Sequence, residues 1–374
     1  MELSYWEYKT WLSNIDYTIV GSGIVGLNCA IHLKELFPKA KVVVLEAGIL
    51  PQGASTKNAG FACFGSISEV LSDLETHSEE EVYELVDQRW KGIQFLRQLL
   101  GNDGIGFQKL GGHELFLEKD HRLYDNCLGQ LERINALLHP IFGARPFVKS
   151  NNKFQFNGIH PQYITHQFEG QLDTGQIMAS LLKLAHKKGV MVLNNLKVES
   201  FQENPEKVLI KTNRLEFETA RVLVATNGFA SQLLDEEVRP ARAQVVITTP
   251  IDNLHIKGTF NFDEGYYYFR NIDDRILFGG GRNLDFKAEE TTTFGQSKRI
   301  QKELERLLRE IILPNTAFEI DLRWSGIMGV GNQKTPIVKP ISDKIYCGIR
   351  LGGMGVALGT AIGRELAELA KASF

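Results

Sequence analysis

Residues 15–26 read I-D-Y-T-I-V-G-S-G-I-V-G, a run with strand character that leads directly into three glycines. Gly21, Gly23 and Gly26 have the G-x-G-x-x-G spacing of a dinucleotide-binding turn. In such a turn the first glycine permits the bend, the second lets a pyrophosphate approach the backbone, and the third lets the helix pack closely on the strand. The segment therefore predicts a βαβ unit that binds a dinucleotide at a helix N-terminus.

The rest of the dinucleotide fingerprint follows in order. A helical pattern covers residues 27–37, and a second apolar run, 41–45, ends in Glu46, 20 residues after Gly26. An acidic residue at this place accepts hydrogen bonds from a ribose and disfavours a 2′-phosphate, so NADP is not expected. An ordinary glycine-rich βα turn is the simpler alternative. The presence of both strands, the helix and the acid together favours the dinucleotide.

Bulk properties narrow the class of protein. The 374 residues predict about two domains, and a net charge of −3 gives no indication of a nucleic-acid partner. The 4 cysteines lack C-x-x-C spacing, which indicates free thiols and a cytoplasmic location. No apolar run is long enough for a transmembrane segment. The aromatic N-terminal residues 5–11 are expected to pack on the core, with a peripheral membrane contact as the alternative.

The order of predicted elements is mixed. The βαβ unit is followed by helices at 79–100, capped by Ser78, and at 122–138, with a strand at 107–118 between them. A helix at 172–189, capped by Asp173 or Thr174, leads to four further strands between 190 and 225. Strands at 244–249, 265–270 and 275–281 read as antiparallel, followed by a helix at 294–312. A strand at 318–324, a short strand at 344–348 and a glycine-rich turn into a final helix complete the chain. We expect two domains that the chain visits more than once.

Several motifs occur in an order that resembles a known family. They are G-A-S-T-K-N-A-G (53–60), L-D-T-G (172–175), A-T-N-G (225–228), Y-Y-Y-F-R…D-R-I-L-F-G-G-G (266–281) and G-G-M-G-V-A-L-G (352–359). Together with the first fingerprint, this set resembles the D-amino-acid-oxidase superfamily of FAD-dependent amine and amino-acid oxidoreductases. Glycine oxidase, sarcosine oxidase and the gamma-glutamylputrescine oxidases belong to that superfamily. The resemblance covers essentially the whole chain, and the ordered set is more specific than the first fingerprint alone.

The resemblance implies a fold and a cofactor. The fold class is α/β plus α+β, with a Rossmann-like FAD-binding domain assembled from residues 1–85, 150–240 and 325–374. A substrate domain built on a mostly antiparallel sheet takes residues 86–149 and 241–324. FAD rather than NAD is expected, in an extended form. Some sarcosine oxidases attach the flavin through a cysteine before a Thr-Pro pair, but no cysteine precedes Thr335-Pro336 here. FAD is therefore expected to be non-covalent.

The resemblance also implies cofactor contacts. Glu46 would bind the adenosine ribose, the backbone of Val198 the adenine, and residues 57–60 the flavin or pyrophosphate. Residues 352–356 would lie at the flavin ring, where backbone N–H groups stabilise negative charge on the reduced ring. The expected cofactor-binding residues are Gly21, Gly23, Ile24, Val25, Gly26, Glu46, Ala47, Ser55, Lys57, Asn58, Ala59, Gly60, Val198, Thr226, Asn227, Gly228, Gly326, Gly352, Gly353, Met354, Gly355 and Val356. The simpler alternative for each glycine is that the turn requires it and that it does not contact the cofactor.

An amino-acid substrate needs a cation for its carboxylate, ideally an arginine. Glycine-oxidase-like members carry an arginine soon after a W-x-G element, where this chain has Met328. Sarcosine-oxidase-like members carry a lysine after the glycine-rich turn, where this chain has Ala357. The usual anchors are therefore missing or moved.

Two arginines are proposed as replacements. Strand alternation would place Tyr266, Tyr268 and Arg270 on one face. The alternative for Arg270 is pairing with Asp273 or Asp274. Arg350, next to the flavin-side glycines, is the second candidate, and its alternative is a salt bridge at a strand end. Arg270, Tyr268, Met328 and Arg350 are thus the predicted catalytic residues, and no metal site is expected.

The sequence predicts an FAD-dependent oxidoreductase. The expected reaction is oxidation of a small amine or amino acid by hydride transfer to flavin N5, with oxygen or another electron acceptor completing the cycle. A 2-hydroxy-acid dehydrogenase of the same superfamily is one alternative. A non-catalytic flavin-binding protein is another, because the usual carboxylate anchors are missing.

Overall fold

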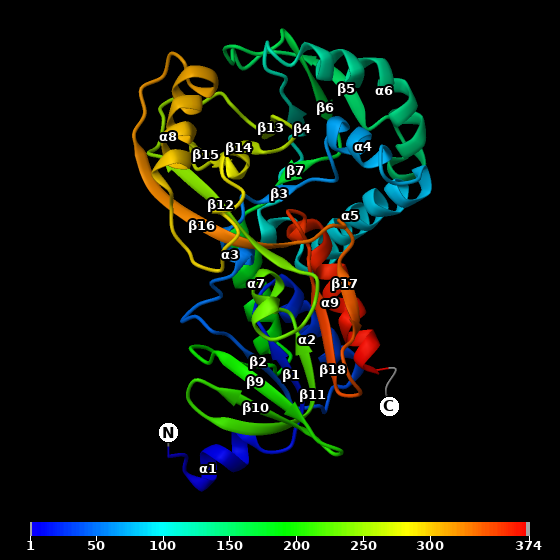
Figure 1. Cartoon of the computed structure of the whole chain (residues 1–374), viewed down its shortest axis with the longest axis vertical. Helices are drawn as coiled ribbons and strands as arrows, with labels where there is room; N and C mark the ends of the chain where they lie inside the picture. Colours follow the sequence, from blue (N-terminus) through cyan, green and yellow to red (C-terminus); the bar gives the residue numbers. More distant parts are fainter. Residues whose placement is uncertain (1, 372–374) are drawn as a thin grey trace.

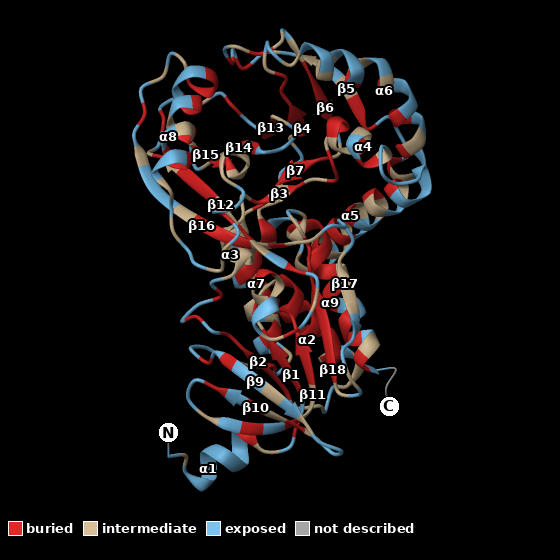
Figure 2. Ribbon diagram, viewed as in Figure 1, coloured by how far each residue is buried: buried red, intermediate tan, exposed pale blue. Residues whose placement is uncertain are grey.

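A computed structural model describes residues 2–371, which fold around two eight-stranded sheets. Each sheet is the centre of one lobe, and the lobes meet at a narrower waist (Figure 1). Residues from distant parts of the sequence contribute to both lobes. In Figure 2 the central strands and the helices that cover them are buried, while the outer faces of the helices are exposed. The fold is a mixed α/β fold with sheets of mixed orientation.

The first sheet contains the predicted βαβ unit. Its strand order is β17-β18-β11-β1-β2-β8, and β9 and β10 extend it as an antiparallel hairpin on β11. The central strands β18, β11, β1, β2 and β8 are parallel, and β17 is antiparallel to β18. The strands are β1 (Ile15–Val20), β2 (Val42–Leu45), β8 (Met191–Leu193), β9 (Val198–Glu203), β10 (Val208–Thr212), β11 (Glu216–Val224), β17 (Ile337–Pro340) and β18 (Ile345–Ile349).

Glycines allow the helices of this lobe to pack closely. Helix α2 (Ile24–Leu36) lies against α9 (Gly355–Lys371), and a Cβ at Gly363 would lie 2.6 Å from the Val25 carbonyl oxygen. Helix α5 (Glu79–Leu100) packs on α9 at Gly92, where a Cβ would overlap the Ala357 carbonyl. Helix α7 (Thr174–Lys187) also contacts α2. These contacts bring the start and the end of the chain together beside the first sheet.

The second sheet is antiparallel except where β13 and β4 pair in parallel. Its order is β16-β12-β15-β14-β13-β4-β6-β5. Buried aromatic rings fill its core, with Phe260 and Phe269 stacked at a centroid distance of 4.7 Å. The strands are β4 (Gly112–Glu114), β5 (Phe147–Asn151), β6 (Gln162–His166), β12 (Arg239–Thr248), β13 (Thr259–Phe262), β14 (Tyr267–Ile272), β15 (Arg275–Gly280) and β16 (Ile320–Val330).

Shorter elements complete the two lobes. Helices α6 (His121–Phe142) and α4 (Ile67–Leu74) pack against each other, and α8 (Lys298–Leu307) continues as a π-helix, Leu308–Ile312. Strands β3 (Phe61–Ala62) and β7 (Gly170–Gln171) form a small two-stranded sheet. The remaining short helices are α1 (Tyr5–Glu7), Tyr8–Leu12, α3 (Ala54–Lys57), Asp103–Ile105, Asn227–Gln232 and Arg282–Leu284.

The predicted elements agree with the structure best where local capping signals are strong. Ser78 forms a capping box with Glu81 at the start of α5, and the Asp173 side chain caps α7. The strand predicted at 107–118 was too long, because only 112–114 form a strand, while Gln108 and Leu117 make isolated bridges. The helix predicted at 122–138 continues to Phe142 although Pro140 lies within it. Strands β5, β6, β13 and β17 were not predicted.

The two-domain division with the boundaries given above stays a prediction, and two sheet positions and one helix contact depart from these boundaries. Strands β5 and β6 (147–166) belong to the second sheet, although residues 150–240 were assigned to the FAD-binding domain. Strand β16 remains in the second sheet until Val330, beyond the predicted boundary at 325. Helix α5 packs on α9 of the first lobe, although most of it was assigned to the substrate domain. Contacts between segments that are distant in the sequence determine which lobe each of these elements joins. Local sequence patterns do not reveal such contacts.

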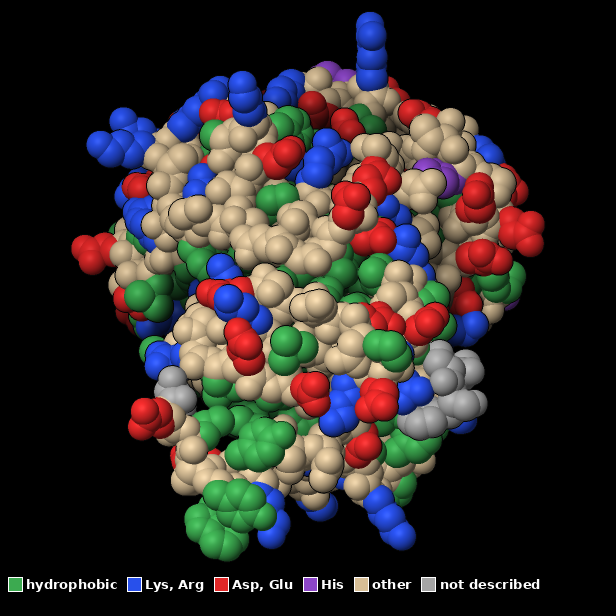
Figure 3. All heavy atoms as spheres, turned by 60° about the horizontal axis from the view of Figure 1, so that its bottom comes forward, with side chains coloured by type: hydrophobic (Ala, Val, Ile, Leu, Met, Phe, Trp, Pro, Cys, Tyr) green, Lys and Arg blue, Asp and Glu red, His purple; other side chains and the backbone are tan. Residues whose placement is uncertain are grey.

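The N-terminal aromatic residues were wrongly expected to pack on the core. The rings of Tyr5, Trp6, Tyr8 and Trp11 are between 48% and 67% exposed, and only Leu12 of this segment is buried. Figure 3 shows hydrophobic side chains gathered on the end of the molecule where α1 lies. Two consecutive short helical turns are too short to place all four rings against the sheet, so only the last turn contacts the core.

No helix in the described part of the chain combines the length and the apolar composition that crossing a bilayer requires.

Candidate active site

A cavity of about 960 Å³ begins at the carboxyl ends of the parallel strands in the first sheet and extends to one face of the second sheet. Val20, Leu45 and Ala225 line it at the ends of β1, β2 and β11, and Tyr268 and Val245 line it from the second sheet. In open parallel sheets, ligands bind at the carboxyl ends of the strands. The volume is near the upper end of the range of small-molecule sites, which suits a large ligand.

The first glycine turn has the geometry that its spacing predicted. Gly21 has φ +104°, and a Cβ there would lie 2.9 Å from the Ala225 carbonyl oxygen. Gly23 faces Ser55, whose Oγ accepts a 2.9 Å hydrogen bond from the Ile24 N–H in the first turn of α2. Gly26 does not line the cavity, and a Cβ there would overlap the Gly21 carbonyl oxygen. Gly26 therefore permits the close packing of turn and helix, and its assignment as a ligand contact is corrected.

Glu46 lies buried at the end of β2 and lines the cavity. Its Oε2 accepts hydrogen bonds from the Ser22 hydroxyl at 2.6 Å and the Ser22 N–H at 3.2 Å. Its Oε1 accepts a 3.0 Å hydrogen bond from the Gly48 N–H. These bonds fix the carboxylate at the edge of the site. Each oxygen keeps acceptor capacity for a ribose hydroxyl, and that contact stays a prediction.

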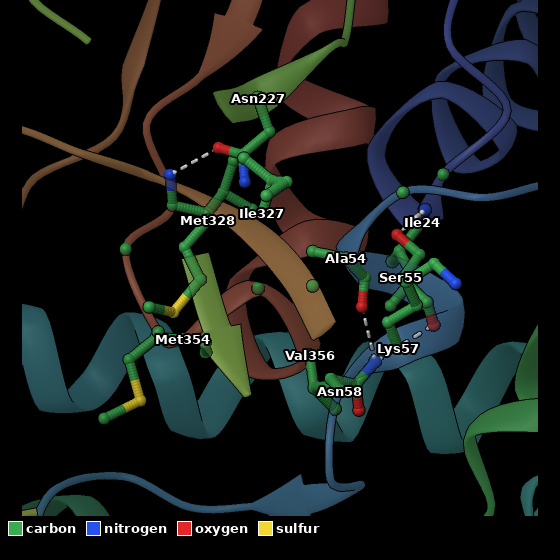
Figure 4. A pocket seen from close by; sticks show the side chains of 18 of the residues that line it. Ile24, Ala54, Ser55, Lys57, Asn58, Asn227, Ile327, Met328, Met354 and Val356 are labelled. Atoms are coloured by element: carbon green, nitrogen blue, oxygen red, sulfur yellow. Dashed lines mark hydrogen bonds between the residues drawn. The ribbon is translucent and has the colours of Figure 1, made fainter. Parts of the chain in front are cut away.

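The segment 53–60 forms one wall of the cavity. Asn58 stabilises this turn, because its Oδ1 accepts a 2.8 Å hydrogen bond from the Gly60 N–H and its Nδ2 donates to the Ala54 and Ser55 carbonyls. The Trp324 Nε1–H donates a 3.0 Å hydrogen bond to the Lys57 carbonyl and ties the wall to β16. In Figure 4, Ser55, Lys57 and Asn58 lie on one side of the pocket, and Met328 and Met354 lie on the other.

The C-terminal glycines border an open part of the cavity. A Cβ at Gly352, Gly353 or Gly355 would meet no atom within 4 Å, and Gly352 has φ +56°. The Asn227 side chain accepts a 3.1 Å hydrogen bond from the Leu351 N–H, and the Gly352 N–H donates a 2.9 Å hydrogen bond to the Gly329 carbonyl. Helix α9 begins at Gly355, and the first N–H groups of a helix have no partner within it. This turn can therefore accept a ligand with partial negative charge.

Most of the predicted cofactor-binding residues line this one cavity, and two do not. Gly228 lies outside the lining together with Gly26, and a Cβ at Gly228 would overlap the Met328 carbonyl on β16. The lining includes Gly21, Gly23, Ile24, Val25, Glu46, Ala47, Ser55, Lys57, Asn58, Ala59, Gly60, Val198, Thr226, Asn227, Gly326, Gly352, Gly353, Met354, Gly355 and Val356. Whether each one contacts a cofactor stays a prediction.

Arg270 does not line the cavity and is not a free anchor for a carboxylate. The residue is 3% exposed. Its Nη1 donates hydrogen bonds to the carbonyls of Leu172 at 2.6 Å, Gly60 at 2.9 Å and Ala59 at 3.2 Å. Asp273 and Asp274, the alternative partners, do not pair with it. Tyr268 and Arg270 share one face of β14, as predicted. Residues 59–60 cover the Arg270 end of that face, and their carbonyls accept hydrogen bonds from the guanidinium.

The other predicted catalytic residues line the cavity. Arg350 is occupied by the protein, because it donates hydrogen bonds of 3.0 and 3.1 Å to the Thr335 carbonyl and lies 3.5 Å from the Glu237 carboxylate. This arrangement matches the strand-end salt bridge that was its alternative. Met328 contributes an apolar side chain from β16. The Tyr268 ring lies over Gly279 and makes an edge contact with Phe61.

No sequence pattern indicated a group of charged residues in the cavity lining. Glu169 Oε1 accepts hydrogen bonds from the Phe64 N–H at 2.7 Å and the Gly65 N–H at 3.3 Å. Arg89 and Lys334 both contact the Glu69 carboxylate, at 3.1 and 3.3 Å. These residues come from four separate segments, so only the tertiary structure brings them together. Glu169 holds the loop after β3, and the Glu69 charge is neutralised within the protein.

Stability is expected to fall between about pH 4.5 and 8 because of Glu169. Burial raises the pKa of Glu169 to about 8, although the Phe64 and Gly65 N–H groups act in the opposite direction. The unfolded chain loses this proton near pH 4.3. Within the window the folded protein therefore binds one proton more than the unfolded protein, so its stability decreases as the pH rises. Urea unfolding of Glu169→Gln at pH 5 and pH 8 should show a smaller loss than in the wild type.

The Glu169→Gln variant should keep part of the pH dependence of stability, because a second buried carboxyl group contributes to it. Burial raises the pKa of Glu114 to about 7, so part of the decrease should persist in Glu169→Gln. Glu80→Gln, a change at an exposed position of α5, is the matched control and should keep the wild-type pH dependence. An equal loss of stability in the wild type and Glu169→Gln would exclude a buried, protonated Glu169.

A parallel sheet with this glycine turn, beside a cavity that a second sheet closes, defines a dinucleotide-binding protein. Residues 16–369 match the family described as DAO, FAD dependent oxidoreductase, and the chain belongs to this family. It is similar to the probable oxidoreductase OrdL of Haemophilus influenzae, with 23% identity over 382 residues, 96% of this chain and 83% of that protein. It is also similar to the gamma-glutamylputrescine oxidoreductase of Escherichia coli, with 24% identity over 95% of this chain and 83% of that protein.

Solved structures share the fold. Glycine oxidase from Geobacillus kaustophilus has a TM-score of 0.76 at 18% identity, over 96% of this chain and 95% of that chain. L-proline dehydrogenase from P. horikoshii has a TM-score of 0.73 at 17% identity, over 95% of this chain and 93% of that chain. At these identities the likeness extends to the fold only.

The cavity fits FAD, the cofactor of the family. Two helix N-termini, those of α2 and α9, border it, and the open glycine turn at 352–355 leaves room for a planar ring system. The first glycine turn and Glu46 would hold the adenosine and pyrophosphate part. The turn before α9 would hold the flavin part. Bound FAD supplies the acceptor for a hydride equivalent, and the chain itself supplies position, polarity and exclusion of water.

Proposed function

We propose that the protein oxidises a small amine or amino acid, with FAD as the immediate acceptor and with oxygen or another compound as the final one. One observation carries this proposal: a single cavity joins the dinucleotide turn of the first sheet to the aromatic wall of the second. A substrate held against that wall would lie beside the place expected for the flavin. The names of the relatives support the same chemistry, since they include a gamma-glutamylputrescine oxidoreductase and a glycine oxidase.

The apolar part of the cavity lining supports binding of an amine in its neutral form. Phe61, Tyr268, Phe294, Met328 and Met354 line the cavity with rings and thioethers. Such surroundings disfavour a charged ammonium group and lower the pKa of a bound amine. The lone pair of the amine nitrogen is then available to stabilise positive charge as the neighbouring C–H bond breaks. The protein thus prepares the amine, while the cofactor accepts the electrons.

Anaerobic reduction of the flavin tests the proposal. Purified FAD-loaded protein is mixed with a panel of primary amines, secondary amines, amino acids and 2-hydroxy acids. We expect loss of the oxidised flavin absorbance with at least one amine or amino acid. Admission of oxygen then shows whether oxygen reoxidises the flavin directly. Reduction by 2-hydroxy acids alone would favour the dehydrogenase alternative, and no reduction by any compound would contradict the proposed function.

The FAD is expected to be non-covalent, so acid precipitation should release all of it from the protein. Cys63 is the one cysteine among the described residues that lines the cavity, and its Sγ lies 3.7 Å from the Met354 sulfur. Burial raises the pKa of the Cys63 thiol, so it is poorly suited to act as a thiolate nucleophile. The measurement compares flavin absorbance in the supernatant and in the washed pellet. Flavin in the pellet of the wild type but not of Cys63→Ser would instead demonstrate a covalent bond.

We also propose a cytoplasmic location. Cys29, Cys63, Cys127 and Cys347 are free thiols in the structure, which suits a reducing compartment.

A further inference from the structure

Basic side chains of the cavity lining differ in whether the protein already neutralises them. Arg89 lies 3.1 Å from Glu69, Lys334 lies 2.6 Å from Asp73, and Arg350 lies 3.5 Å from Glu237. Among the described residues of the lining, Lys57, Lys197 and Arg282 remain without an ion pair or a side-chain hydrogen bond. An unneutralised cation in a partly enclosed cavity is a candidate for recognition of an anion.

Position separates these three cations. Lys197 is exposed and precedes Val198, at the end of the cavity where the dinucleotide turn lies. Lys57 belongs to the 53–60 wall, and its Nζ lies 5.2 Å from the centre of the Phe294 ring. Arg282 lies two residues after the end of β15 and lines the cavity. Among the described residues of the lining, it is therefore the unneutralised cation that follows a strand of the second sheet.

The local structure holds Arg282 in place. Gly281, with φ +76°, turns the chain at the end of β15, and its N–H donates a 3.0 Å hydrogen bond to the Tyr266 carbonyl. The Arg282 guanidinium carbon lies 4.9 Å from the centre of the Phe286 ring. Such stacking orients a guanidinium and leaves its edge free to donate hydrogen bonds.

Nearby carboxylates do not neutralise Arg282. Glu289 is buried and contacts Arg242 with two hydrogen bonds of 2.8 Å, and Gln244 donates to it at 2.9 Å. Glu290 is exposed and forms no ion pair with Arg282. Burial lowers the pKa of Arg282 from its ordinary value, while Tyr266, Glu289 and Glu290 act in the opposite direction. The guanidinium has therefore lost water without gaining a close counter-ion.

Two polar side chains lie on the same wall. Asn261 on β13 is opposite Tyr268 on β14, which in turn is opposite Gly279 on β15, three residues before Arg282. The Asn261 Oδ1 is buried without a hydrogen-bond partner in the described part of the protein. Burial raises the pKa of Tyr268 to about 12, so its hydroxyl stays protonated and can donate. The wall thus combines a cation and a hydroxyl donor, while the Asn261 Oδ1 is shielded from the cavity.

We propose that Arg282 binds the carboxylate of an amino-acid substrate. This inference rests on the proposed function and narrows it from amines in general to amino acids. An arginine donates to both oxygens of a carboxylate, and the interaction is stronger in a site that excludes water. Arg282 would then replace the anchors that are missing at Met328 and Ala357, from a different strand of the wall.

The test uses FAD-loaded protein and two probes of the same shape, benzoate and benzamide. Calorimetric titration should give tighter binding of benzoate in the wild type. In Arg282→Met the affinity for benzoate should fall roughly 10- to 100-fold, while benzamide changes little. Arg282→Lys keeps the charge but cannot donate bidentate hydrogen bonds to a carboxylate, so it should retain part of the preference for benzoate over benzamide. Arg309→Met is the matched control, because Arg309 stacks on Phe318 at 4.8 Å and does not line the cavity.

The substrate itself gives a second readout. Once the screen identifies an amino-acid substrate, Arg282→Met should raise its KM with a smaller change in kcat, and should leave the KM of the decarboxylated amine nearly unchanged. Equal affinity of the wild type for benzoate and benzamide would overturn the inference, as would an unchanged preference in Arg282→Met or in Arg282→Lys. Failure of the proposed function looks different, since the flavin of the wild type would then not be reduced by any amine or amino acid.

Discussion

Replacement of Gly26 by alanine is expected to abolish FAD binding and to destabilise the first lobe. The added Cβ would overlap the Gly21 carbonyl oxygen and would also lie 3.1 Å from the Gly21 carbonyl carbon and 3.2 Å from an Ile19 methyl group. The contact is with backbone in the glycine turn, so no side-chain rotation relieves it. Overpacking of this kind costs about 1–3 kcal/mol and sometimes more. Flavin absorbance per protein and urea unfolding of the apoprotein measure the two effects.

Gly129 provides a matched control for this substitution. It lies within α6, and a Cβ there would meet no atom within 4 Å. Gly129→Ala should therefore leave FAD binding intact and raise stability by up to about 1 kcal/mol, because alanine is the better helix former. A Gly26→Ala variant that binds FAD as the wild type does would contradict the close packing of the turn on α2.

Replacement of Arg270 by methionine is expected to reduce both stability and FAD affinity, although Arg270 does not line the cavity. The change removes the shared donor of the Ala59, Gly60 and Leu172 carbonyls. A buried acceptor without a partner costs about 1–3 kcal/mol, and the Gly60 carbonyl keeps the Leu172 N–H as a donor, so the loss of stability should reach at least about 2 kcal/mol. Residues 59–60 line the cavity, so their displacement should weaken FAD binding. Urea unfolding and FAD titration of the apoprotein measure these effects.

Arg133 is the control for the loss of an arginine. Its side chain is 53% exposed and pairs with Glu79 at 2.8 Å on the surface. Arg133→Met should change stability by no more than about 1 kcal/mol, since exposed ion pairs contribute little. A variant Arg270→Met with normal stability and normal FAD affinity, but a raised KM for a carboxylate substrate, would favour the original assignment of Arg270 as an anchor.

The comparison of Arg270 with Arg282 explains how far sequence patterns can identify the substrate side of the site. Strand alternation placed Tyr268 and Arg270 on one face, and the register of β13, β14 and β15 agrees. Alternation cannot show that residues 59–60 and Leu172 cover one end of that face. It also cannot show that Glu289 already has a partner in Arg242, which leaves Arg282 unneutralised.

Short sequence patterns were enough to predict the local features of this protein. The spacing of Gly21, Gly23 and Gly26, the cap at Ser78 and the glycine turn before α9 each depend on a few neighbouring residues, so their patterns predict structure directly. Only the folded chain shows which strands pair, that Glu169 holds the loop after β3, and which arginine in the described cavity lining stays without an ion pair. Those outcomes depend on contacts between residues about 50 to more than 200 positions apart, and no local pattern records them.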